Sequence, residues 1–193
     1  MKSRTMSLYG TCGGRKYLSP QERTLFSDNA KKCDPSTKTF CLLLLWTGVR
    51  ISEALDLRWS NIDLDQKVVT VECLKKRRKG VFRHIPISDE LARELHLHLS
   101  TNSEYLLDHR IWRWSRRTAS RRIKSVMTSA GISGIRACPK GIRHSFAVYS
   151  IIKGIPLIML KKWMGHSSLE TTEIYLNIVG PEEREVAQRL WLA

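Results

Sequence analysis

Five residues are spread along the chain in an order that suits phosphodiester transfer: Arg50, Lys75, Arg143, His166 and Tyr175. This reaction builds negative charge on the non-bridging oxygens, which fixed hydrogen-bond donors stabilise. The planar fork of an arginine can bind two such oxygens at once. A phenol has a pKa of about 10, so it must lose its proton as it attacks. The five side chains together could supply a phosphate clamp, an acid and a nucleophile.

Three short segments around these residues resemble the catalytic motifs of the tyrosine recombinases, the phage integrases of the lambda and Xer type. They are Thr-Gly-Val-Arg-Ile-Ser-Glu at residues 47–53, Arg-His-Ser-Phe-Ala at residues 143–147, and Gly-His at residues 165–166 with Tyr175 nine residues after the histidine. The resemblance covers about residues 17–180. It implies an α+β fold, mainly α-helical with a small antiparallel β-sheet, and an enzyme that forms a 3′-phosphotyrosine without a cofactor.

The resemblance also implies a role for each residue. Arg50 and Arg143 match the arginines that clamp the phosphate, Tyr175 matches the nucleophile, and His166 is expected to donate a hydrogen bond to the phosphate. Glu53 is expected to orient Arg50 or a backbone amide. Each residue also has a structural alternative. Arg50 could form a helix-terminal ion pair with Glu53, His166 could cap a helix, and Tyr175 could be a half-buried helix tyrosine.

An acid for the leaving 5′-oxygen is expected in a basic turn between two strand-like runs, residues 68–71 and 81–87. Counting on from the first run favours Lys75, with Lys76 and Lys79 as alternatives. The other basic residues of the turn are expected to contact DNA, or to be solvated turn charges. The basic residues of the turn are Lys75, Lys76, Arg77, Arg78 and Lys79.

One position departs from the family pattern. The motif around Arg143 commonly opens with a histidine three residues earlier, and here that position holds Lys140. A lysine can donate to the phosphate, but it can accept the phenol proton only if neighbouring positive charge lowers its pKa. The base that serves Tyr175 therefore stays open. His144, which follows Arg143, is expected to have a structural role.

A second basic segment lies at residues 113–124, with two tryptophans beside it. Arg117, Arg121 and Lys124 share one helical face, so phosphate contacts are expected there. A merely solvated basic face would have the same pattern. The candidate DNA-binding residues of this segment are Arg113, Arg116, Arg117, Arg121, Arg122 and Lys124.

The chain as a whole is strongly basic, with 193 residues and a formal net charge of +15. This favours a polyanionic partner such as nucleic acid. The longest apolar run, residues 40–46, is too short to cross a membrane, which takes about 20 residues. Five scattered cysteines form no metal-ligand pattern, and the N-terminus has no secretory signal. A cytoplasmic, reduced setting without a metal is expected.

The elements that must position these residues are mainly helices. Capping signals at Ser19 and Asp34, each followed by proline, start two of them. Gly48 ends the second helix, so Arg50 should lie just past a helix terminus and before a short helix at residues 51–58. Further helices are expected at residues 88–99, 115–130, 139–153, 156–164, 168–178 and 182–190.

Three parts are expected along the chain: a loose tail at residues 1–16, a catalytic domain at residues 17–180 and a C-terminal helix at residues 181–193. Most family members carry a DNA-clamping domain before the catalytic domain. A minimal recombinase, a partner-dependent one and a fragment all fit this length. The C-terminal helix is expected to dock on a neighbouring protomer with Trp191 as its anchor, and packing on its own domain is the alternative.

The resemblance therefore implies a site-specific recombinase acting on paired sites in double-stranded DNA, monomeric in solution and homotetrameric on DNA, through a Holliday junction. The outcome (integration, excision, inversion or resolution) and the need for a helper protein stay open. Two alternatives remain. A DNA-binding or architectural protein could keep the fold without the chemistry, and a type IB topoisomerase-like enzyme would relax supercoils as a monomer by the same chemistry.

Overall fold

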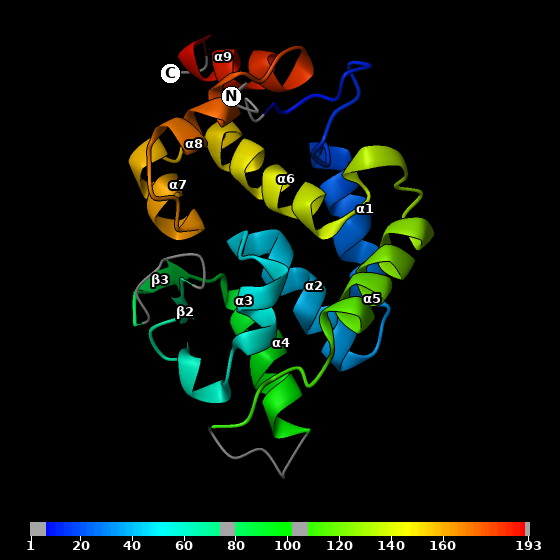
Figure 1. Cartoon of the computed structure of the whole chain (residues 1–193), viewed down its shortest axis with the longest axis vertical. Helices are drawn as coiled ribbons and strands as arrows, with labels where there is room; N and C mark the ends of the chain where they lie inside the picture. The colour runs from blue at the N-terminus through cyan, green and yellow to red at the C-terminus, as the bar shows by residue number, and fades with distance from the viewer. Residues whose placement is uncertain (1–6, 74–79, 102–107, 192–193) are drawn as a thin grey trace, which may run out of the picture.

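The computed structural model describes residues 7–73, 80–101 and 108–191. This part of the chain is mainly helical, with an antiparallel sheet in the order β1-β2-β3, which confirms the predicted fold class (Figure 1). The helices are α1 (Pro20–Lys31), α2 (Pro35–Thr47), α3 (Ile51–Asp56), α4 (Asp89–Ser100), α5 (Arg116–Ser129), α6 (Pro139–Ile152), α7 (Leu157–Met164), α8 (Glu170–Glu173) and α9 (Pro181–Trp191). The strands and 3-10 turns are β1 (Ile62–Asp63), β2 (Val68–Glu72), β3 (Phe82–Pro86), η1 (Trp59–Asn61), η2 (Gly134–Arg136) and η3 (Ile174–Leu176).

The first two helices begin at the predicted capping signals. The Ser19 hydroxyl accepts from the Glu22 N–H, and the Glu22 carboxylate accepts from the Ser19 N–H, so two otherwise unpaired donors are satisfied. The Asp34 carboxylate caps α2 by accepting from the Thr37 N–H. This helix ends at Gly48, whose φ of 62° and closeness to the Phe146 ring leave no room for a Cβ atom. The tight turn places Arg50 at the start of α3.

Buried apolar side chains form two clusters. The larger one fills the space between α1, α2, α4, α5 and the sheet. The smaller one lies around α6 and α7 and includes Leu8, Tyr17, Tyr175 and Ile178. Figure 1 shows α6 crossing between these two parts of the molecule, and its residues contribute to both clusters. Side chains on α6 can therefore link the two parts.

One predicted helix differs in the structure, and one strand was not predicted. Residues 168–178 form the short α8 and the η3 turn in place of one helix, since β-branched residues favour helices weakly and Thr172 bonds to His166. The strand β1 has two residues and pairs with β2, and it is too short to leave an alternating pattern in the sequence. The tip of the predicted hairpin, residues 74–79, lies outside the described residues, whereas β2 and β3 pair as expected.

Leu8, Tyr9 and Arg15 contact the rest of the domain, in contrast to the loose tail that was expected at residues 1–16. Leu8 is 1% exposed and belongs to the smaller cluster, and its carbonyl accepts from the Lys16 N–H at 2.8 Å. The Tyr9 hydroxyl accepts from the Val179 N–H. Burial of one leucine and these hydrogen bonds oppose the freedom that the glycines in this segment would otherwise give.

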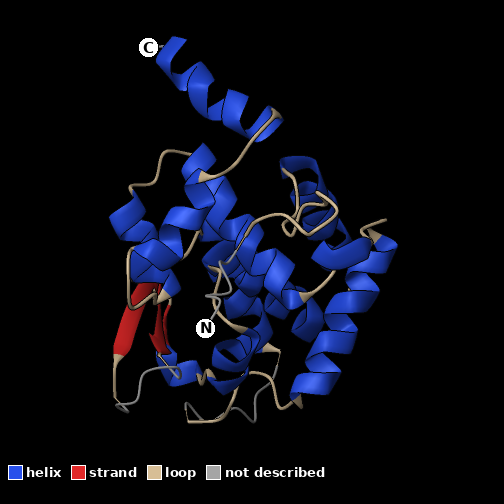
Figure 2. Cartoon of the chain, turned by 45° about the horizontal axis from the view of Figure 1, so that its top comes forward, coloured by secondary structure: helices blue, strands red, loops and turns tan. Residues whose placement is uncertain are grey.

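The C-terminal helix α9 follows a loop after η3 and lies at one end of the molecule, whereas the sheet lies at an edge of the helical body (Figure 2). Its first turn is held by an ion pair between Glu182, 3% exposed, and Arg15 at 3.0 Å. Val186 packs against the smaller cluster. Leu190 and Trp191 at the far end are 80% and 66% exposed. Within the described residues, no helix combines the length and the apolar character that a membrane span requires.

Candidate active site

Four of the predicted catalytic residues meet in space although they come from separate segments. Arg50 precedes α3, Arg143 lies on α6, His166 follows α7 and Tyr175 lies in η3. The Arg143 Nη2 atom is 3.1 Å from His166 Nε2, and the His166 and Tyr175 rings stack with centroids 6.3 Å apart. The charge of Arg50 acts on each of the other three. Lys75, the fifth residue of the set, lies outside the described residues.

Arg143 is held by the ends of two helices. Its Nη1 donates to the Gly48 carbonyl at 2.6 Å and its Nη2 to the Met164 carbonyl at 2.7 Å. These carbonyls stand at the C-termini of α2 and α7, where unpaired oxygens and the helix dipoles favour a cation. Burial, followed by the charge of Arg50, lowers the pKa of Arg143 to about 10, so the guanidinium stays charged at neutral pH.

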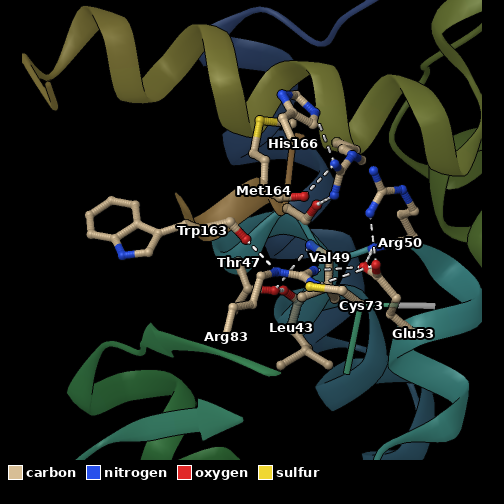
Figure 3. A network of polar contacts seen from close by, with 12 residues as sticks. Leu43, Thr47, Val49, Arg50, Glu53, Cys73, Arg83, Trp163, Met164 and His166 are labelled. Carbon is tan, nitrogen blue, oxygen red and sulfur yellow. Dashed lines mark hydrogen bonds and ion pairs between the residues drawn. The ribbon is translucent and has the colours of Figure 1, made fainter. Parts of the chain in front are cut away.

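A buried carboxylate orients Arg50 (Figure 3). The Glu53 side chain is 0% exposed, and its oxygens accept from the Arg50 Nη1 at 2.7 Å and from the Arg50 N–H at 2.8 Å. It thus contacts both partners that were expected for it. The same carboxylate accepts from Arg83 Nη2 at 2.7 Å. Burial alone would raise the pKa of Glu53, but the hydrogen bonds and charges of Arg83 and Arg50 outweigh it and hold the pKa below its ordinary value.

Arg83 lies in the second of the two predicted strand-like runs and was not among the predicted site residues, yet it joins three parts of the site. Besides Glu53, it donates from Nε to the Trp163 carbonyl at 2.7 Å and from Nη1 to Cys73 Sγ at 3.2 Å (Figure 3). Its side chain is 4% exposed. The buried residues of β3 are Arg83 and Ile85, which alternate with exposed ones. An arginine at such an inward-facing position was the sequence signal that Arg83 has a buried partner.

Tyr175 is 1% exposed, and its Oη lies 3.0 Å from His144 Nδ1. Burial raises the pKa of this phenol to about 12, although the charges of Arg143 and Arg50 act in the opposite direction. Tyr175 is therefore protonated at neutral pH. Any attack by its oxygen requires a group that takes the proton.

The two imidazoles beside Tyr175 are neutral at pH 7. Burial, followed by the charges of Arg143 and Arg50, lowers the pKa of His166 to about 3. Since a guanidinium only donates, His166 Nε2 accepts from Arg143 and its Nδ1 carries the proton that reaches Thr172 Oγ1 at 2.9 Å. Donation from His166 to a phosphate stays a prediction, because this tautomer has no proton on Nε2.

The predicted DNA-binding residues of α5 fall into two groups. Arg116, Arg117, Arg121 and Lys124 are exposed on the helix. Arg122 instead pairs with Asp34 at 2.9 Å and lies over the Trp114 ring at 4.5 Å. Arg113, before the helix, is within 2.9 Å of His109. Contact of any of them with DNA stays a prediction, and the hairpin residues Lys76, Arg77, Arg78 and Lys79 lie outside the described residues.

Lys140 is exposed in the first turn of α6, one turn before His144. In the described part of the chain, no cluster of histidine, cysteine, aspartate and glutamate side chains could hold a metal ion.

Comparison with known proteins gives a consistent result. Residues 16–179 match the model of the Phage integrase family. The chain is 30% identical over 152 residues to tyrosine recombinase XerA of Thermococcus kodakarensis, which covers 77% of this chain and 53% of that protein. The chain thus spans about half the length of the curated relatives that it matches.

Solved structures share the fold. The crystal structure of XerA recombinase gives a TM-score of 0.79 at 24% identity and covers 90% of this chain and 64% of that one. The structure of XerH site-specific recombinase bound to its difH substrate gives a TM-score of 0.73 at 20% identity, covering 96% of this chain and 55% of that one.

Proposed function

The chain belongs to the phage integrase family, and from this premise we propose that it is the catalytic part of a tyrosine-class site-specific DNA recombinase. It cuts one strand of double-stranded DNA at a time, holds the 3′ end as a phosphotyrosine on Tyr175 and rejoins it to a new 5′-hydroxyl. The observation that carries the proposal is the convergence of Arg50, Arg143, His166 and Tyr175 from four separate segments.

In the cleavage step, the Tyr175 oxygen forms a bond to phosphorus while the bond from phosphorus to the 5′-oxygen breaks. Arg50 and Arg143 hold the non-bridging oxygens, and Lys140 donates a further hydrogen bond to them. His166 donates one as well once its proton has moved from Nδ1 to Nε2. Lys75 gives a proton to the leaving 5′-oxygen. The phosphotyrosine ester keeps the free energy of the phosphodiester bond that was broken, so rejoining needs no nucleotide cofactor.

A nicked suicide substrate tests the proposal. When the 5′ fragment diffuses away, the protein should stay covalently attached to DNA through Tyr175. Tyr175→Phe should abolish the covalent complex and keep DNA binding, whereas the control Tyr149→Phe, on the part of α6 that packs against Arg23, should leave trapping intact. A covalent adduct in the Tyr175→Phe variant would refute the assignment, and failure of the natural chain to form any adduct would favour a non-catalytic DNA-binding protein.

The hairpin lysine can be identified by changing the leaving group. Lys75→Ala should lose cleavage of ordinary DNA and regain it on a 5′-bridging phosphorothiolate, whose sulfur leaves without a proton. Rescue confined to Lys76→Ala or Lys79→Ala would move the acid to that residue.

A recombinase can be separated from a type IB topoisomerase by its products. A recombinase should resolve Holliday junctions on a cognate site, whereas a topoisomerase would relax supercoils as a monomer.

Double-stranded DNA is the proposed partner, in line with the difH substrate of XerH and the charge of +15. Each phosphate contact contributes about −0.9 to the log–log salt dependence of binding, so a slope of roughly −4 to −6 is expected. Arg121→Ala should reduce its magnitude by about 0.9. Arg122→Ala is the matched control, because that side chain is already paired with Asp34. Equal effects of the two changes would argue against a DNA-facing α5.

A homotetramer on DNA is the proposed assembly, with the far end of α9 docking on the next protomer. Two features support this: Leu190 and Trp191 are exposed, whereas Glu182 fixes the first turn in cis. Trp191→Ala should lose the synapsis of two sites and retain single-site binding. Deletion of residues 182–193 should also lose synapsis, but it removes the Glu182–Arg15 pair and the Val186 contacts, so it should weaken the monomer as well. Synapsis that persists in Trp191→Ala would support packing of α9 on its own domain.

A further inference from the structure

The residue next to Arg143 contacts the nucleophile directly. On α6, Arg143 extends to the Gly48 and Met164 carbonyls, whereas His144 presents Nδ1 to Tyr175 Oη at 3.0 Å. His144 is 3% exposed. Its other nitrogen, Nε2, is buried and has no hydrogen-bond partner within the described residues. The phenol oxygen is thus the one hydrogen-bond partner that the described structure gives this imidazole.

The protonation states favour His144 over Lys140 as the acceptor of the phenol proton. Burial, followed by the charges of Lys140 and Arg143, lowers the pKa of His144 to about 4, so its ring is neutral at pH 7 and can accept a proton. A lysine ammonium has three donors and no acceptor. Lys140 is exposed, and no hydrogen bond joins it to Tyr175 in the described part of the chain.

The phenol oxygen also lies close to the phosphate clamp. The charges of Arg143 and Arg50 both act on Tyr175, and the His166 ring stacks on its ring. The oxygen therefore has His144 on one side and the two arginines in its neighbourhood. This is the geometry required of a base that must reach the nucleophile while the phosphate is held.

We propose that His144 is a catalytic residue, the general base for Tyr175; this inference rests on the proposed function above. As Oη forms its bond to phosphorus, the phenol proton passes to His144 Nδ1. The bond to the 5′-oxygen breaks with its electron pair, and that oxygen takes its proton from Lys75. On rejoining, the steps reverse, and His144 returns the proton to Tyr175 Oη.

A weakly basic imidazole suffices for this step. The phenol becomes strongly acidic as its oxygen turns into an ester oxygen, so the proton moves late and with a large driving force. The negative phosphodiester also offsets the positive charges of Lys140 and Arg143, which act against a charged His144 in the free protein. Bound DNA therefore favours the protonated imidazole.

The test measures the single-turnover rate of covalent trapping on a prebound suicide substrate. His144→Asn keeps a hydrogen-bonding group beside Tyr175 Oη but cannot act as a base, and it should slow trapping by about 10²- to 10³-fold without loss of DNA binding. A fluorinated tyrosine has a more acidic phenol. Placed at position 175 of the His144→Asn variant, it should raise the trapping rate by at least about tenfold. Lys140→Gln, measured with both phenols, is the matched control and should gain no such recovery.

Each other outcome overturns the inference. Trapping that is unchanged or faster in His144→Asn would mean that the histidine only holds the Tyr175 side chain in its buried position. A loss that fluorinated tyrosine does not relieve would mean a structural role, and recovery seen with Lys140→Gln would make Lys140 the base. If the Asn variant does not fold, His144→Gln gives the same comparison. Absence of trapping by the natural chain would instead overturn the proposed function, and this inference with it.

Discussion

The two halves of the site are held in different ways. Arg50, Glu53 and Arg83 form a buried ion network on the edge of the larger apolar cluster, with every Glu53 oxygen paired. Tyr175 lies in a three-residue turn on the smaller cluster, and within the described residues its hydroxyl has one hydrogen-bond partner, His144. The half proposed to hold the phosphate is therefore fixed by charge, and the half with the proposed nucleophile is fixed by packing.

This difference matches what each half must do. Donors that stabilise a developing charge work best when their positions do not change during the reaction. Tyr175, the proposed nucleophile, is 1% exposed, so the groups that cover it have to give way before a phosphate can reach its oxygen, with the His144 contact kept. Short turns, few hydrogen bonds and a neighbouring loop allow that motion at a low cost in free energy. Mutations should therefore destabilise the first half strongly and the second half weakly.

The largest effect is expected from Glu53→Gln. This change keeps the side-chain volume but removes the charge that compensates buried Arg83, and breaking such a pair costs about 3–5 kcal/mol. The free energy of unfolding in denaturant measures the loss. Asp56→Asn, on the same helix, breaks an exposed pair with Arg110 and should cost about 0–1 kcal/mol. Similar losses for both variants would contradict the view that the buried network fixes this half.

A pair of glycines sharpens the comparison at the level of the backbone. Gly48 and Gly180 both have positive φ, 62° and 78°. A Cβ at Gly48 would lie 2.3 Å from the Phe146 ring, whereas a Cβ at Gly180 would meet nothing within 4 Å. Gly48→Ala should therefore cost about 3 kcal/mol, from overpacking and strain together, and Gly180→Ala about 1 kcal/mol from strain alone. Thermal unfolding of the two variants measures the difference, and equal costs would count against it.

Much of this architecture was predictable, because its signals are local. Capping residues fixed the starts of α1 and α2, and three short motifs identified Arg50, Arg143, His166 and Tyr175. The break between α8 and η3 and the packing of residues 7–16 were missed, since both depend on contacts with distant parts of the chain. The local sequence pattern gives no information about contacts between segments that are far apart in the chain.

The partners of the proposed catalytic residues were harder to predict for the same reason. His144 lies inside a recognised motif, yet the atom it contacts is 31 residues away in sequence. Arg83 and Glu53 are 30 residues apart, and the pairing depends on how β3 lies against α3. A motif identifies which residues matter, whereas their contacts follow from how the elements assemble.

A moderate effect is expected from pH, and it acts on the nucleophile half. His144 and His166 have pKa values of about 4 and about 3 in the folded protein, against about 6.5 when unfolded. Between these values the unfolded chain binds more protons, so stability rises with pH and falls as pH drops below about 6.5. Each histidine should cost about 1 kcal/mol between about pH 7.5 and 5.5.

A variant of one buried histidine checks this pH dependence. His166→Asn should reduce the change in unfolding free energy between the two pH values by about 1 kcal/mol. His144 keeps its own contribution, and burial also lowers the pKa of His98, so a residual slope of the same sign should remain in His166→Asn. A slope that His166→Asn does not change would mean that the imidazole is not held neutral.

The smallest effect is expected at the end of α9. Trp191 is 66% exposed, so Trp191→Ala should change the unfolding free energy of the monomer by no more than about 0.5 kcal/mol. Val186→Ala, which removes contacts with the smaller cluster, should cost about 1 kcal/mol. An aromatic side chain that stabilises nothing in its own protomer is free to bind another one. A loss above about 1 kcal/mol in Trp191→Ala would mean that the tryptophan packs in cis, and the proposed docking between protomers would lose its anchor.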